Sequence, residues 1–158
     1  MIGEYDSKPS SGKLIVSVCN NSLKYFNEGG RNFVYSKDVA VAIVNAIKMG
    51  KLGECYLAGN ENLTFYEFFN KIYKVLGKTF DMKKVGKIPI LIIGFLGSIW
   101  ARITRTKPLI SLGIAKISLE NSYYDISKAR RELNMPATPI ETAIANSISW
   151  FKANNYIK

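Results

Sequence analysis

The sequence contains no histidine among its 158 residues. This absence excludes Ser-His-Asp and Cys-His catalysis and every histidine-ligated metal site. The two cysteines, Cys19 and Cys55, stand far apart and form no C-x-x-C pair. We therefore predict no metal site, and we expect both thiols to be small buried apolar groups in a reducing compartment.

Long hydrophobic runs are also scarce, and no secretory signal is visible, because Met1 to Lys13 is polar and rich in turn formers. We therefore expect a cytoplasmic protein. The longest uncharged block, Ile88 to Ala101, would extend over only about 21 Å as a helix, which is too short for a bilayer core of about 30 Å. A buried helix or a lid helix is the default interpretation. The alternative is an interfacial membrane anchor, which Trp100 and several flanking basic residues would suit. These are Lys83, Lys84, Lys87, Arg102, Arg105 and Lys107.

Acidic residues are few, and the net charge is +10. Residues 71–131 contain thirteen Lys or Arg but only three Asp or Glu. Such a band is typical of proteins that bind nucleic acid, an anionic membrane or a phosphate-bearing ligand. Nucleic acid is disfavoured, because no predicted helix combines a basic face with a recognisable reading motif.

Periodicity and turn residues predict many helices and few strands. Helices are expected at about residues 13–26, 38–49, 64–76, 89–104, 109–119, 127–133 and 140–151. Short strands are expected at residues 32–35, 54–58 and, less clearly, 79–85 and 122–124. Thr64 with Glu67 and Thr138 with Glu141 are spaced as capping boxes, and Ser36 or Asp38 is predicted to be the N-cap of the helix that ends at about Met49. So few short strands indicate part of a larger α/β fold.

Three stretches have the order and spacing of a known family. The first is Gly3 to Ser10. The second is Arg31-Asn32-Phe33-Val34-Tyr35-Ser36-Lys37-Asp38-Val39-Ala40, with the later run Gly53 to Glu61. The third is Tyr124-Asp125-Ile126-Ser127-Lys128-Ala129-Arg130-Arg131-Glu132-Leu133, with Thr138-Pro139-Ile140-Glu141 and Trp150-Phe151. Together they resemble the C-terminal half of the extended short-chain dehydrogenase/reductase family, especially its dihydroflavonol-reductase-like and epimerase/dehydratase branches.

The resemblance implies a C-terminal, helix-rich portion of a Rossmann-type fold, with residues 1–158 forming a single incomplete domain. The family's phosphate-binding G-x-x-G-x-x-G loop, its catalytic serine and its Tyr-Lys pair would lie upstream of Met1. The parent protein would use NAD or NADP, while this chain alone would bind no cofactor and would not be catalytic. Its partner would be the missing N-terminal half. The nearest glycine pattern here, Gly94-Phe95-Leu96-Gly97, instead predicts helix packing.

The resemblance also provides candidate substrate-binding residues. In nucleotide-sugar epimerases the arginine at the place of Arg31 binds the substrate diphosphate, as a planar guanidinium suits phosphate oxygens. Tyr25 and Tyr35 are candidates for the pocket wall, and Phe26 is a further aromatic residue that could line it. The alternatives are a solvated arginine at a turn and tyrosines in the core. Tyr124 and Lys128 have Y-x-x-x-K spacing, but we expect them to belong to a structural signature, with Tyr124 preceding the helix.

We therefore predict the substrate-binding portion of an NAD(P)-dependent oxidoreductase or epimerase. The substrate would be a sugar nucleotide or a small hydroxy or keto molecule. The alternative function is a non-enzymatic basic module that binds an anionic membrane surface.

Overall fold

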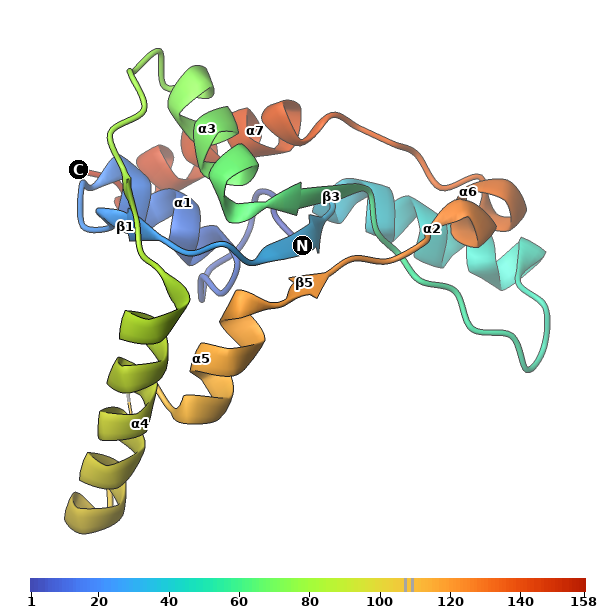
Figure 1. The fold of residues 1–158 in the computed structure, drawn as a ribbon. Coiled ribbons are helices and arrows are strands. Elements are labelled where there is room, and N and C mark those ends of the chain that lie inside the picture. The colour runs from blue at the N-terminus through green and yellow to red at the C-terminus, as the bar shows by residue number, and fades with distance from the viewer. Residues whose placement is uncertain (107, 109) are drawn as a thin grey trace.

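The computed structural model describes residues 1–106, 108 and 110–158 (Figure 1). Its helices are α1 (Gly12–Cys19), α2 (Ser36–Met49), α3 (Phe65–Val75), α4 (Lys87–Thr104), α5 (Leu112–Leu119), α6 (Ser127–Leu133) and α7 (Ile140–Ala153). Its strands are β1 (Tyr25–Phe26), β2 (Gly30–Phe33), β3 (Glu61–Thr64), β4 (Lys83–Lys84) and β5 (Asn121–Ser122). The chain is α/β and rich in helices, which confirms the predicted fold class. Lys107, one of the basic residues noted above, lies outside the described residues.

Two small sheets join segments that are distant in the sequence. In one sheet β2 lies in the middle, antiparallel to β3 and parallel to β5. In the other sheet β1 and β4 form a parallel pair. Ile2 adds a parallel bridge to Tyr35, and its amide donates a hydrogen bond to the carbonyl of Val34 at 2.9 Å. The two sheets therefore connect segments that lie far apart in the sequence.

The main core lies where α1, α3 and α7 pack together (Figure 1). Its fully buried side chains are Ile2, Ile15, Phe68, Ile72, Ile140, Ile144, Ser147 and Phe151. Phe33 of β2 stacks on Phe68, with ring centroids 3.9 Å apart. The predicted capping box at the start of α3 is confirmed, because Thr64 and Glu67 exchange hydrogen bonds there. These contacts anchor β2 and β3 to the helices.

A second, smaller cluster joins α2 to α6, which lie side by side away from the main core (Figure 1). It contains Val34, Val39, Ala42, Ala129 and Met135. The remaining apolar side chains of α2 are uncovered, with Ile43 62% and Ile47 82% exposed. One face of this helix is therefore apolar and in contact with solvent.

The helix α4 projects from the body and packs on α5 (Figure 1). A Cβ atom at Gly94 would lie 2.6 Å from the Cβ of Ala115, and one at Gly97 would collide with the carbonyl oxygen of Ile110. Helix packing by these glycines is thus confirmed. The prediction of a buried helix is wrong for α4, because Gly94 is its only buried residue. By length and composition alone, α4 is the one described helix that could cross a membrane.

The helix predicted for residues 13–26 is wrong beyond Cys19. The chain leaves the helix at Asn20 and Asn21, and Asn21 has a φ of 54°, a left-handed conformation that asparagine tolerates better than most residues. The following residues, Tyr25 and Phe26, pair with β4. The helix therefore ends two turns early and leaves room for a strand.

The strand predicted for residues 54–58 is also wrong, because this segment is a loop. Its Tyr56 packs against the second cluster, and the strand that pairs with β2 is β3 instead. Cys55 is exposed and Cys19 is partly buried, so the expectation of two buried thiols fails for Cys55. The other strands exist but are shifted or shorter than predicted.

Candidate functional site

The three candidate substrate-binding residues lie in different surroundings. Arg31 is exposed on β2, with its Cα opposite those of Leu63 and Ser122. Tyr25 on β1 is 59% exposed and lines a cavity. Tyr35 precedes α2 and is only 4% exposed. Of the three, the structure brings only Tyr25 to the cavity described below, and the predicted binding roles stay predictions.

Tyr35 is part of a hydrogen-bonded network that fixes the N-terminal loop. Its hydroxyl donates to Glu4 Oε2 at 2.8 Å and accepts from Asn146 Nδ2 at 2.9 Å. The ammonium group of Lys37 donates to Glu4 Oε1 at 2.8 Å. Burial alone would raise the pKa of Glu4, but the hydrogen bonds from Lys37, the backbone and Tyr35 outweigh burial and lower that pKa. Tyr35 is thus held by α7 and the N-terminal loop.

Neither of the predicted residues, Ser36 or Asp38, is the N-cap of α2, because Tyr35 occupies that position and α2 has no side-chain cap. The carboxylate of Asp38 is 3% exposed and accepts hydrogen bonds from the amide and the hydroxyl of Thr138, both at 2.8 Å. The capping box predicted at Thr138 is therefore also wrong, since its hydroxyl is used by Asp38 and Pro139 is the N-cap of α7. This pair fastens α2 to the segment that leads into α7.

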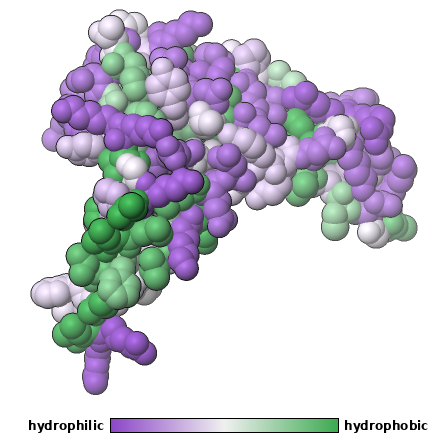
Figure 2. Space-filling view, viewed as in Figure 1, coloured by the Kyte–Doolittle hydropathy of each residue, from purple (hydrophilic) through white to green (hydrophobic). Residues whose placement is uncertain are grey.

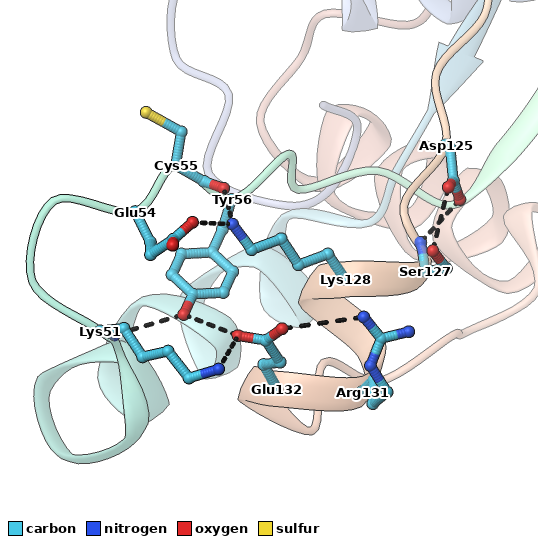
Figure 3. Close-up of polar contacts among 9 residues, drawn as sticks. All are labelled: Lys51, Glu54, Cys55, Tyr56, Asp125, Ser127, Lys128, Arg131 and Glu132. Carbon is cyan, nitrogen blue, oxygen red and sulfur yellow. Dashed lines mark hydrogen bonds and ion pairs between the residues drawn. The ribbon is translucent and has the colours of Figure 1, made fainter.

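The Y-x-x-x-K pair does not form a catalytic arrangement. Tyr124 precedes α6, as predicted. Lys128 instead donates to Glu54 at 2.5 Å and to the carbonyl of Cys55 at 3.0 Å, and its ammonium lies 4.7 Å from the ring centroid of Tyr56 (Figure 3). The hydrogen bond to Glu54 raises the pKa of Lys128. A lysine held as a cation in this way fastens the loop at residues 51–58 to α6.

A second ion pair completes this cluster. Tyr56 donates to Glu132 at 3.1 Å, and Lys51 lies 3.2 Å from the same carboxylate (Figure 3). The hydrogen bond from Lys51 is the largest influence on Glu132 and lowers the pKa of its carboxyl group. The cluster is therefore structural and consists of paired charges around one tyrosine.

An apolar cavity of about 390 Å³ lies between the main core and the α4–α5 pair. We call it the apolar pocket. It is lined by Leu14, Leu23, Tyr25, Phe26, Asn27, Phe65, Phe69, Val85, Ile90, Ile93, Ile110, Ile114 and Ser118. A concave, mostly apolar wall with a few neutral polar groups is the usual form of a small-molecule site.

Sequence reasoning found only part of this pocket. Tyr25 and Phe26 were candidates, but the aliphatic side chains of α4 and α5, together with Asn27 and Ser118, were missed. Their only sequence signal was an apolar composition that core residues share. Asn27 stands out in the structure, because its Oδ1 atom is buried and has no hydrogen-bond partner among the described residues.

No family model matches the chain. The chain is 27% identical over 163 residues to a protein from Synechocystis sp. named "Putative dihydroflavonol 4-reductase", and this match covers 99% of the chain and 47% of the relative. The crystal structure of gox2253 matches 99% of this chain and 48% of its own length, with 25% identity and a TM-score of 0.82. The chain has the fold of the C-terminal portion of an extended short-chain dehydrogenase/reductase. It spans about half the length of the curated relative that it matches.

Two further solved structures share this extended-reductase fold. A nucleoside-diphosphate-sugar epimerase from Pseudomonas aeruginosa has a TM-score of 0.74 at 23% identity, covering 99% of this chain and 47% of the epimerase. A UDP-glucuronic acid 4-epimerase from Bacillus cereus, solved in complex with NAD, has a TM-score of 0.63 at 15% identity, covering 97% of this chain and 42% of that enzyme. At these identities the comparison concerns the fold alone, and it confirms the predicted resemblance.

The residues of this chain do not fit a dinucleotide cofactor by themselves. A dinucleotide needs a glycine-rich turn between a strand and a helix, where backbone amides reach the pyrophosphate. The nearest glycine pattern lies within α4, where Gly94 and Gly97 are occupied by close packing against α5 and the segment before it.

Proposed function

We propose that residues 1–158 form the substrate-binding portion of an NAD(P)-dependent oxidoreductase or epimerase/dehydratase. The substrate is a sugar nucleotide or a small hydroxy or keto molecule. The observation that carries this proposal is the match of 99% of the chain to about half of a reductase-like relative. The apolar pocket supports it, because the pocket gives this portion a binding cavity without any cofactor-binding loop.

The cofactor, NAD or NADP, and the catalytic Tyr-Lys pair would come from a cofactor-binding half. The uncovered apolar face of α2, with Ile43 and Ile47 exposed to solvent, offers a surface on which such a half could pack. Ile2 forms a parallel bridge to Tyr35. Parallel pairing is typical of larger, covered α/β sheets, so further strands of the cofactor-binding half could extend the sheet at Ile2. The proposal places the enzyme in the cytoplasm. A purely non-enzymatic module finds no support, since the relatives named above are a reductase and epimerases.

Ligand-induced NMR shifts in the isotopically labelled chain test this proposal. The chain would be titrated with dihydroquercetin, as a hydroxy-ketone, and with UDP-glucose, as a sugar nucleotide. We expect at least one of them to shift the amide signals of Tyr25, Phe26 and Asn27 in a saturable manner. Tyr124 and Lys128 serve as the internal control and should not respond. Saturable shifts around Lys128 with none at the pocket would contradict the proposed site.

A further inference from the structure

The apolar pocket has a wall without charged side chains. The polar residues in its lining are Tyr25, Asn27 and Ser118, all neutral. A diphosphate is normally bound by charge-assisted donors from arginine or lysine, and the described wall contains neither. The pocket is therefore suited to a neutral and largely apolar molecule.

Asn27 is the lining residue of the pocket that carries a buried, unpaired polar atom among the described residues. Its Oδ1 atom is buried without a partner among the described residues, and a buried unpaired acceptor is energetically costly. Once the amide turns toward the pocket, a hydroxyl group on a ligand can donate to this oxygen. Asn27 also borders a neighbouring hollow of about 470 Å³ that contains Glu28, Thr64 and Lys84. The polar end of an amphiphilic ligand would thus lie at Asn27.

The apolar surface continues from the pocket along the outside of α4. A shallow hollow of about 490 Å³ on this helix is lined by Ile93, Leu96, Gly97, Ile99, Trp100 and Ile103. Ile93 belongs to the walls of both the pocket and this hollow. Figure 2 shows the apolar side chains gathered over α4, while most of the visible body is polar. Trp100 and Ile103 are 68% and 72% exposed.

Positive charge surrounds this apolar helix. Arg102 and Arg105 are exposed at its C-terminal end. At its N-terminal end, Lys84 and Lys87 lie 2.5 and 4.0 Å from Glu28, which partly neutralises them. Residues 82–119 contain no Asp or Glu at all. An exposed apolar helix with a tryptophan and cations at its ends is typical of helices that lie in an anionic membrane surface.

We propose that α4 lies in the surface of an anionic membrane, and that the apolar pocket takes a neutral, lipid-like hydroxy or keto substrate from that membrane along α4. This inference rests on the proposed function and names the substrate class of the same pocket. A second copy of the chain is a poorer partner for α4, because it would bring the same positive charges to the interface. The whole of α4 is long enough to cross a membrane by length and composition alone. Its uncharged block, residues 88–101, extends over only about 21 Å against a bilayer core of about 30 Å, so a position along the surface suits it better than a spanning one.

Vesicle flotation tests the membrane contact. The purified chain would be floated with phosphatidylcholine vesicles and with vesicles that contain phosphatidylglycerol. We expect the chain to float with the anionic vesicles, and a Trp100→Ser/Ile103→Ser variant to lose about tenfold or more in partitioning. The matched control is Ile43→Ser/Ile47→Ser, which removes two exposed apolar side chains of α2 and should float like the wild type. Equal flotation of both variants, or no flotation of the wild type, overturns the membrane contact.

Displacement of an apolar fluorescent probe, N-phenyl-1-naphthylamine, tests the substrate class. We expect dodecanol to displace the probe from the chain and UDP-glucose to leave it bound. Asn27→Leu should weaken dodecanol about five- to tenfold while keeping probe affinity, since only the hydrogen bond is lost. Unfolding midpoints of the variants check that they remain folded.

The outcomes separate this inference from the proposed function. If UDP-glucose displaces the probe and dodecanol does not, the lipid-like substrate is wrong, but a substrate-binding role stands. If neither ligand binds and the chain instead binds NADPH, the proposed function fails as well. A wild type that floats with vesicles but does not take dodecanol overturns the link between α4 and the pocket.

Discussion

The hydrogen-bonded pair of the buried Asp38 and the half-buried Thr138 gives the sharpest stability prediction. These residues are 100 positions apart, and their two hydrogen bonds of 2.8 Å connect α2 to the segment before α7. Thr138→Val removes the bond from the hydroxyl and keeps the bond from the amide. A hydrogen bond to a charged group contributes roughly 1.5–3 kcal/mol. We therefore expect Thr138→Val to lower the free energy of unfolding by about 1.5–3 kcal/mol.

Asp38→Ala should cost more, because it removes both bonds and leaves the amide of Thr138 without its acceptor. We expect a loss of roughly 3–6 kcal/mol, twice the value for one hydrogen bond to a charged group. The double variant should cost about as much as Asp38→Ala alone, since the hydroxyl bond is already absent. Additive losses would show that the two side chains do not interact.

Urea unfolding followed by circular dichroism measures all three free energies. A double-mutant cycle then isolates the coupling between the two side chains. Ser149→Ala is a suitable control, because the exposed Ser149 hydroxyl donates only to the carbonyl of Ala145 within α7. A coupling free energy near zero, with midpoints close to that of the wild type, would refute the role assigned to this pair.

Arg31, Glu4 and Gly94 each give a further prediction. Arg31→Ala should weaken UDP-glucose binding about ten- to a hundredfold by calorimetry if the substrate is a sugar nucleotide, and Arg31→Lys should not restore it; unchanged affinity would exclude a diphosphate contact. Because hydrogen bonds lower the pKa of Glu4 in the fold, its contribution to stability is present above its unfolded pKa and is lost as the pH falls through the folded value. Glu4→Gln should therefore flatten the acid limb of stability against pH, and an unchanged limb would contradict this network. Gly94→Leu should lower the free energy of unfolding by about 1–3 kcal/mol through collision with α5, as thermal unfolding can show, and a neutral effect would mean that α4 and α5 do not pack.

The features that could be predicted from the sequence are those set by neighbouring residues. The capping box of Thr64 and Glu67 depends on two residues three positions apart, and it forms as expected. The same motif at Thr138 fails because Asp38, 100 residues away, takes its hydroxyl. A local pattern therefore predicts a cap only where no distant acceptor competes for the same donor.

The site shows the same contrast. Tyr25 was a candidate for the pocket from the sequence, and the structure places it in the wall. Ile93 and Ile114 could not be assigned, because an aliphatic residue in a helix gives no indication of which side remains uncovered. For the same reason the sequence left α4 open between a buried or lid helix and an interfacial anchor, since its composition suits a core helix as well as a membrane surface.

The central claim is that this chain binds substrate and leaves the cofactor to another part of the enzyme. The most direct test is a titration of NADPH into the purified chain, followed by NADPH fluorescence and by calorimetry, with an intact extended short-chain dehydrogenase/reductase as the positive control. We expect no saturable binding to this chain and clear binding to the control. Tight, saturable binding of NADPH to residues 1–158 would contradict it.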